Sequence, residues 1–231
     1  MYWYWDATYI LVIIGAIVSA IASWNVNRTF KNFSKFSNGK GLTAEDCAAV
    51  IMHGAGIYDV RIERIRGTLT DHYSPSEKVL RLSDSVYGST SVAALGVAAH
   101  ECGHAIQHKQ GYFPLKLRAV SVPVANIGSK LSWPIIIIGL VIGQMGIARI
   151  GVVLFGFVVL FQLITLPVEF DASNRALKIL EQKKLLIGGE LKGATKVLRA
   201  AALTYVASLF SSILQLLRLI LLTRGSSNRR R

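Results

Sequence analysis

Four long runs of apolar residues interrupt an otherwise polar chain. They cover residues 7–24, about 119–142, 150–168 and 201–223. Each is about as long as the helix of roughly 20 residues that crosses the hydrocarbon core of a bilayer. The first run follows a segment without Lys or Arg, so it lacks the basic start of a cleaved signal peptide. The pattern therefore predicts a mainly α integral membrane protein with about four apolar helices.

The polar region between the first two runs, residues 25–118, has the capping signals of two helices. Thr43 is followed three residues later by Asp46, as at a helix N-terminus, and Gly54 suits the end of that helix. A second helix, rich in alanine, is expected from about Ser91 to Lys109.

Between these helices, apolar and polar residues alternate at 58–62 and again near 79–82, with turn residues at 74–77. Alternation of this kind is typical of half-buried strands. The sequence thus predicts a small α+β domain with a short antiparallel sheet of two or three strands.

Composition and charge support a membrane location. The chain is 52% hydrophobic and only 17% charged, and its formal net charge is +13. The basic residues cluster beside the apolar runs, at 28–40 and 175–199, which follows the positive-inside rule and suits contact with anionic lipid headgroups. We therefore expect no nucleic-acid partner. With only Cys47 and Cys102, no disulfide framework is expected either.

The position of the last apolar run has two interpretations. If residues 25–40 are cytoplasmic, the second and third runs form a hairpin that returns the chain to the cytoplasm near Pro167. A complete fourth span would then place residues 229–231, all arginine, outside the cell, against the rule. The run also carries one polar stripe, made of Thr204, Ser208, Ser211, Gln215 and Arg218. The stripe faces other helices or a hydrated cavity in a span, or else the helix lies along the interface.

The candidate chemistry lies on the alanine-rich helix, in the sequence His-Glu-Cys-Gly-His at 100–104. His100 and His104 are one turn apart, so both imidazoles can bind a single Zn²⁺. Glu101 is then placed to take a proton from a water molecule that attacks a peptide carbonyl. The motif predicts a zinc-dependent hydrolase with one zinc ion.

His108 continues the spacing of four but does not fit the same ion. It is about 12 Å along the helix from His100, at 1.5 Å per residue. The alternative motif, with glycine at 107 and histidine at 110, is excluded because both positions are glutamine. We therefore expect His108 to be solvated or to support a ligand.

The third ligand should be a His, Asp or Glu far away in sequence. His53 and His72 precede the motif, and Glu169 and Asp171 follow it. An even number of membrane crossings separates the motif helix from Glu169, so both return to one membrane surface. This argument favours Glu169.

The chain resembles a known family through His-Glu-Cys-Gly-His-Ala-Ile-Gln-His at 100–108, Glu-Phe-Asp-Ala-Ser-Asn-Arg-Ala-Leu at 169–177 and the segment at 71–83. These segments are similar to the YugP-like membrane zinc metallopeptidases and, more distantly, to HtpX-type and CAAX-prenyl-type membrane proteases. The resemblance implies zinc held by His100, His104 and Glu169, with Glu101 as general base. It also implies a supporting residue at 173, where the distant relatives have Asp and this chain has Ser173; Asp171 is the alternative.

An oxyanion stabiliser is also expected, because a tetrahedral intermediate needs a hydrogen-bond donor. The candidates are His72, Tyr73, Arg175 and Tyr205. A strand edge near 79–82 is a candidate for binding an extended substrate.

The expected organisation follows from these elements. It comprises a first transmembrane helix at 1–24, a cytoplasmic zincin-like domain at 25–118, a transmembrane hairpin at 119–168, a third-ligand helix with a basic cytoplasmic segment at 169–200, and a C-terminal apolar helix with a basic tail at 201–231.

Three functions remain open at this point. We favour an endopeptidase in a bacterial plasma membrane, with a cytoplasmic active site and a peptide or membrane-protein substrate. The alternatives are a non-catalytic scaffold or adaptor, with a structural metal or none, and a zinc-dependent hydrolase that acts on lipid. The number of protein ligands distinguishes catalytic from structural zinc, since catalytic sites keep one position open.

Overall fold

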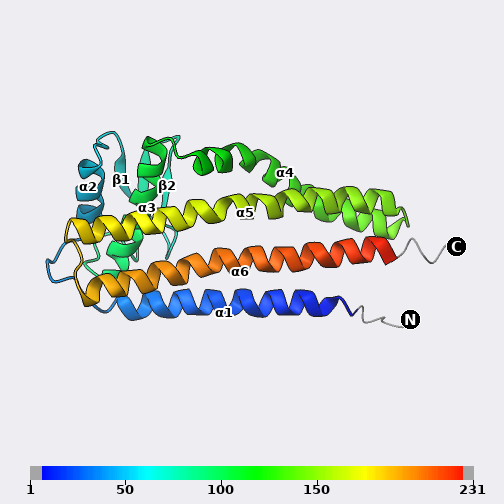
Figure 1. Cartoon of the computed structure of the whole chain (residues 1–231), viewed down its shortest axis with the longest axis horizontal. Coiled ribbons are helices and arrows are strands. Elements are labelled where there is room, and N and C mark those ends of the chain that lie inside the picture. The colour runs from blue at the N-terminus through cyan, green and yellow to red at the C-terminus, as the bar shows by residue number, and fades with distance from the viewer. Residues whose placement is uncertain (1–6, 226–231) are drawn as a thin grey trace. The chain divides into compact units, whose positions relative to one another are not determined.

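The computed structural model describes residues 7–225, which form six helices and three strands. In chain order they are α1 (Tyr9–Phe33), α2 (Ala44–Gly54), β1 (Arg61–Ile65), β2 (His72–Ser74), β3 (Val79–Ser83), α3 (Val92–Lys109), α4 (Phe113–Val141), α5 (Met145–Gln182) and α6 (Gly189–Gly225), as Figure 1 shows.

Two compact units share these elements. The membrane unit comprises Met1–Ala22, Leu117–Leu166 and Thr204–Arg231, and the polar unit comprises Ser23–Lys116 and Pro167–Leu203. All four long helices, α1, α4, α5 and α6, have residues in both units.

Four helices, α1, α4, α5 and α6, are long and apolar enough to cross a membrane, as the sequence predicts. Most of their apolar side chains are exposed: in α1 only 6% of the apolar window is buried. Exposed apolar surface on this scale is stable in lipid rather than in water. The chain is therefore an integral membrane protein.

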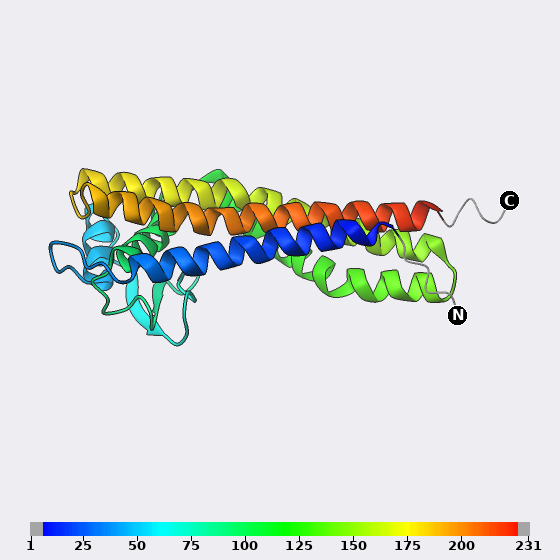
Figure 2. The same ribbon diagram turned by 90° about the horizontal axis from the view of Figure 1, so that it is seen from below.

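In the membrane unit, α1 and α6 lie side by side and antiparallel (Figure 1 and Figure 2). The Ser211 hydroxyl donates a hydrogen bond to the Gly15 carbonyl at 2.6 Å and lies 2.8 Å from the Ser19 hydroxyl. Further along α6, the Arg218 guanidinium lies 4.0 Å from the centre of the Tyr9 ring. Two members of the polar stripe thus face another helix, which supports a full-length span for α6 over an interfacial helix.

The sheet of the polar unit is mixed, with strand order β1-β3-β2. β2 and β3 pair antiparallel, as expected, but β1 and β3 pair parallel, with Arg61 opposite Val79. The expectation of an antiparallel sheet is wrong for this pair because β3 inserts between the two earlier strands. Four of its five residues are buried, so it takes the central place. The expected free edge at 79–82 is also wrong, since β3 is paired on both sides and β2 is an edge strand.

The predicted motif helix is confirmed as α3, and its packing determines where its histidines lie. The Ser91 side chain caps its N-terminus by accepting a hydrogen bond from the Ala94 N–H at 3.2 Å. Gly103 faces α5 so closely that a Cβ there would lie 2.5 Å from the Ala172 carbonyl oxygen. Because glycine has no side chain, the two helix backbones come together beside the histidines.

Candidate metal centre

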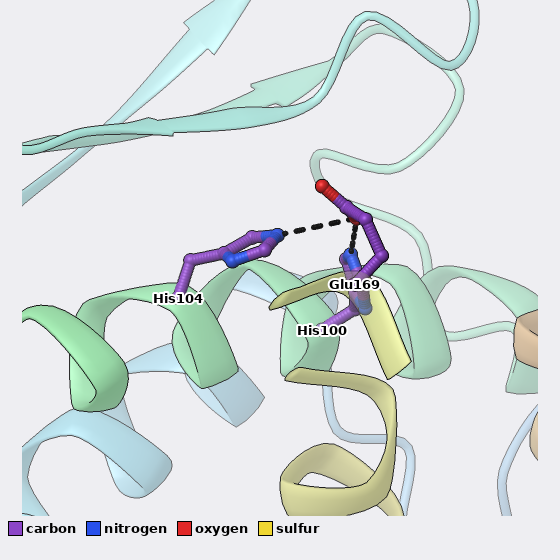
Figure 3. A group of neighbouring side chains, drawn as sticks. All are labelled: His100, His104 and Glu169. Carbon is purple, nitrogen blue, oxygen red and sulfur yellow. Dashed lines mark ion pairs between the residues drawn. The ribbon is translucent and has the colours of Figure 1, made fainter. Parts of the chain in front are cut away.

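Three potential metal ligands converge between α3 and α5. His100 and His104 project from one face of α3, with ring centres 4.8 Å apart. The Glu169 Oε2 atom of α5 lies 3.3 Å from His100 Nε2 and 3.6 Å from His104 Nε2, as the dashed lines in Figure 3 show. Among the described residues, these three form a group whose ligand atoms all lie within 4.8 Å of one another. The group could hold a single metal ion.

The orientation of His104 is fixed by Gln107. The Gln107 Nε2 amide donates to the Val168 carbonyl and to Asp171 Oδ2, both at 2.8 Å, so its Oε1 atom is left to face His104 Nδ1 at 3.0 Å. Because Oε1 can only accept, Nδ1 carries the proton and donates it. A neutral His104 therefore presents its Nε2 lone pair to Glu169.

This arrangement suits a cation. An imidazole lone pair and a carboxylate oxygen repel each other unless a proton or a metal ion lies between them. Burial lowers the pKa of His104, but the hydrogen bond that the protonated imidazole donates to Glu169 and the charges of Glu101 and Glu169 outweigh it, so the pKa is raised overall. The site thus attracts positive charge. Two imidazoles and one carboxylate are also a donor set that zinc accepts in enzymes.

His100 is oriented from α5. Its Nδ1 atom lies 3.0 Å from the Ser173 hydroxyl, four residues after Glu169. The buried Ser173 therefore touches the imidazole at the position where the resemblance implied a supporting residue. A hydroxyl does here what a carboxylate does in many metal sites, which is to hold the ring so that Nε2 faces the ligand group.

A chain of polar contacts continues behind Gln107. Asp171 accepts from the Gln107 amide and from the Arg175 guanidinium, which also donates to Gln110 Oε1. The Arg175 guanidinium lies 5.5 Å from the centre of the Tyr112 ring. Asp171 and Arg175 thus support His104 through Gln107, which is completely buried. The sequence analysis missed Gln107, although its position three residues after His104 puts it on the same helix face.

Glu101 is mostly buried, with 8% of its surface exposed. Burial raises the pKa of Asp71, hydrogen bonds from Ser83 lower it, and the Glu101 charge raises it further, with a raised pKa as the result. The residue just before β2 is therefore close enough to Glu101 for their charges to interact.

The remaining sequence candidates lie elsewhere. His108 is exposed and its Nδ1 atom lies 2.9 Å from the Tyr73 hydroxyl, so it ties α3 to β2. The His72 Nδ1 atom lies 2.9 Å from the Thr70 carbonyl. The His53 ring packs against Tyr58 at 5.3 Å. Tyr205 belongs to the membrane unit and is 39% exposed.

Comparison with known proteins supports this chemistry. A family model described as "Putative neutral zinc metallopeptidase" matches residues 8–224. The chain is also 42% identical over 215 residues to "Putative membrane protease YugP" of Bacillus subtilis (strain 168), covering 93% of this chain and 96% of that protein. No solved structure matches the chain. Together with the His-His-Glu cluster, these matches show that the chain belongs to the neutral zinc metallopeptidase family that this model describes.

Proposed function

We propose that the protein is an integral-membrane zinc endopeptidase. The observation that carries the proposal is the convergence of His100, His104 and Glu169, of which the two histidines lie on the helix that also carries Glu101. Among the described residues this group offers three ligand atoms, which leaves one tetrahedral position for water or substrate. A structural site would be closed by four protein ligands. The geometry therefore favours catalysis over a scaffold with structural zinc.

In the proposed mechanism, His100, His104 and Glu169 would hold a zinc ion, which would supply Lewis acidity to lower the pKa of water and to polarise a carbonyl oxygen. Glu101 takes the proton of the attacking water and passes it to the leaving amine nitrogen. Ser173 and Gln107 hold the two imidazoles in position, and the buried surroundings of Glu101 and Glu169 exclude bulk water. This assigns Glu101 as the general base.

The substrate is proposed to be a peptide segment that adds to the free edge of β2. This edge strand packs against α3, and Tyr73 of β2 contacts His108 of α3. Strand addition supplies main-chain hydrogen bonds that are independent of substrate sequence. Methylating successive backbone nitrogens of a cleaved peptide should slow cleavage at least at one position. Equal cleavage of every methylated peptide would exclude strand addition.

We also propose that the active site faces the cytoplasm. The basic residues at 28–40 and 175–199 belong to the polar unit, which carries the metal ligands. Both native cysteines are buried, so a cysteine introduced at an exposed site can be labelled selectively. Ser76→Cys should react with an impermeant maleimide only after the membrane is opened. Gln144→Cys, in the connection between α4 and α5, should react in intact cells, and the reverse pattern would contradict the orientation.

The decisive test of the activity is Glu101→Gln. The amide keeps the size of the side chain but cannot accept the proton, so peptide hydrolysis should fall by about a hundredfold to ten-thousandfold. Zinc should remain bound at about one ion per chain, because Glu101 is not a ligand. Hydrolysis at the wild-type rate in this variant would contradict the proposal and leave a scaffold as the better explanation. Cleavage of lipid esters alone, lost in the same variant, would indicate a lipid hydrolase.

A further inference from the structure

A second polar site lies in the polar unit, between the C-terminal half of α1 and the N-terminal half of α6. It is a pocket of about 520 Å³, and three of its lining side chains are cationic: Arg28, Lys196 and Arg199. Its other lining residues are Asn25, Thr29, Asn32, Phe33, Ala200 and Leu203. No carboxylate belongs to this lining within the described part of the chain.

Three like charges around one hollow repel each other, since two charges 4 Å apart interact by about 4 kcal/mol at a dielectric constant of 20. Aromatic rings hold two of these cations in place. The Arg28 guanidinium lies 4.9 Å from the centre of the Trp24 ring, and the Lys196 ammonium lies 5.8 Å from the centre of the Phe33 ring. These ring contacts favour positions of the Arg28 and Lys196 side chains beside the pocket, which lowers the entropy cost of binding an anion there.

The position of the pocket along the chain points to a lipid. Its α1 residues directly follow the first apolar run, which ends at Trp24, and its α6 residues, at 196–203, lie at the start of the last apolar run. Trp24 is 60% exposed, as expected for an aromatic side chain at the membrane interface. Cations at this level of a membrane helix attract the headgroups of anionic lipids.

A neighbouring apolar pocket favours an amphiphile over a free anion. This pocket, of about 340 Å³, lies between α5 and α6 and shares Arg199 and Leu203 with the basic pocket. It is lined mainly by apolar side chains: Phe170, Leu177, Leu198, Ala202 and Leu203. The basic pocket matches the phosphate of a phospholipid, and the adjoining apolar pocket matches its first methylene groups. A free phosphate would use only the basic pocket.

We propose that the pocket between α1 and α6 binds the phosphate of an anionic phospholipid headgroup. Arg28, Lys196 and Arg199 donate to the phosphate oxygens, and the amides of Asn25 and Asn32 contact the rest of the headgroup. The apolar pocket also includes Ser173, the residue that orients His100. A bound lipid therefore lies next to a support of the metal centre. This site is separate from the proposed peptidase mechanism and does not depend on it.

The test uses the full chain, purified in detergent and titrated with phosphatidylglycerol, while native mass spectrometry counts the retained lipid. The double variant Arg28→Gln/Lys196→Gln removes two of the three cations and should weaken binding roughly 30-fold, at about 1 kcal/mol per charge. The matched control is Lys31→Gln/Lys192→Gln, which removes two exposed charges from the same helices outside the pocket. It should bind like the wild type.

Two further arms identify the ligand. Phosphatidylcholine, whose headgroup has no net charge, should bind at least tenfold more weakly than phosphatidylglycerol, and inorganic phosphate at millimolar concentration should not displace the lipid. Asn32→Glu, which adds a carboxylate to the lining, should weaken binding without removing any cation. Equal losses in the test and control double variants would overturn the proposal, as would displacement of the lipid by inorganic phosphate.

Discussion

The two units of this molecule use the same apolar residues in opposite ways. In the polar unit, Leu80, Leu82 and Leu95 are completely buried between the sheet and the helices. In the membrane unit, Val120 and Val141 are 75% and 79% exposed. The first arrangement is the core of a water-soluble domain, and the second requires lipid as the surrounding solvent. One chain therefore carries a buried candidate metal centre and a lipid-facing anchor.

The forces that stabilise each unit internally differ in the same way. Burial of apolar side chains stabilises the polar unit. In lipid that driving force is absent, and helices associate through close packing of small residues and through hydrogen bonds. The membrane unit shows both: Gly139 packs against the Ala148 backbone, Gly151 lies against the Ser132 carbonyl, and Ser211 bonds to Gly15. Changes to metal ligands and changes to small residues should therefore have separable effects.

The largest expected effect comes from removing a ligand in the polar unit. His104→Ala should remove zinc from the purified protein and reduce peptide hydrolysis by at least about a thousandfold, since several kcal/mol of transition-state stabilisation are lost. Metal analysis and a peptide cleavage assay measure the two effects. His108→Ala is the matched control, because His108 is exposed and contacts Tyr73 instead of the cluster. Loss of zinc in both variants would contradict the assigned ligand set.

A smaller effect is expected at Gln107. Gln107→Leu keeps the approximate size of the side chain but removes the acceptor that fixes the His104 ring. Zinc affinity should fall about 10-fold to 100-fold, the usual cost of losing such a support. Competition with a chelator of known affinity measures it. Gln110→Leu is the comparison directly after the same helix, since Gln110 contacts Arg175 and is exposed; an equal loss there would mean that Gln107 has no special role.

Two glycines allow a direct comparison of the units. A Cβ at Gly103 would meet the Ala172 carbonyl, and one at Gly139 would meet the Ala148 backbone. Each substitution to alanine should destabilise its own unit by about 1–3 kcal/mol. Only Gly103→Ala should weaken zinc binding, because it separates α3 from the helix that carries Glu169.

Unfolding in detergent, followed by circular dichroism and by zinc release, distinguishes these effects. Gly146→Ala is the control, because a Cβ at Gly146 has no neighbour within 4 Å in the described structure. Equal weakening of zinc binding by Gly103→Ala and Gly139→Ala would show that the two units do not respond separately.

The smallest expected effect concerns the bond between α1 and α6. Ser211→Ala removes the hydrogen bond to the Gly15 carbonyl. Such bonds between membrane helices contribute about 0.6 kcal/mol on average. The free energy of unfolding in mixed micelles should fall by about that amount, with peptide hydrolysis unchanged. A loss of hydrolysis without a loss of stability would show that this contact acts on the active site.

Much of the site followed from local spacing. His100 and His104 are one turn apart on a capped helix, and this periodicity alone predicted that they meet. Glu169 was predicted as the third ligand because an even number of apolar runs returns the chain to the membrane surface where the motif helix lies. Gln107 was missed because its role depends on α5, which supplies Val168 and Asp171 from about 60 residues away.

The pairing of the strands in the sheet could not be predicted from the sequence. Alternation identified β1 and β3 as strands but did not specify their partners. Adjacent strands in sequence usually pair, so an antiparallel meander was the natural expectation. The central position of β3 depends on the burial of its side chains in a core shared with residues of α2 and α3, and the pattern of a single strand does not contain that information.

The most direct test of the central claim is X-ray absorption at the zinc edge on the purified, zinc-loaded protein. The account predicts two imidazole nitrogens, carboxylate oxygen from Glu169 and one further light-atom ligand that a small inhibitor such as a hydroxamate replaces. The Glu169→Gln variant should not give a spectrum with this set of ligands. Four protein ligands that no inhibitor displaces would contradict the account, because such a closed site cannot bind a substrate.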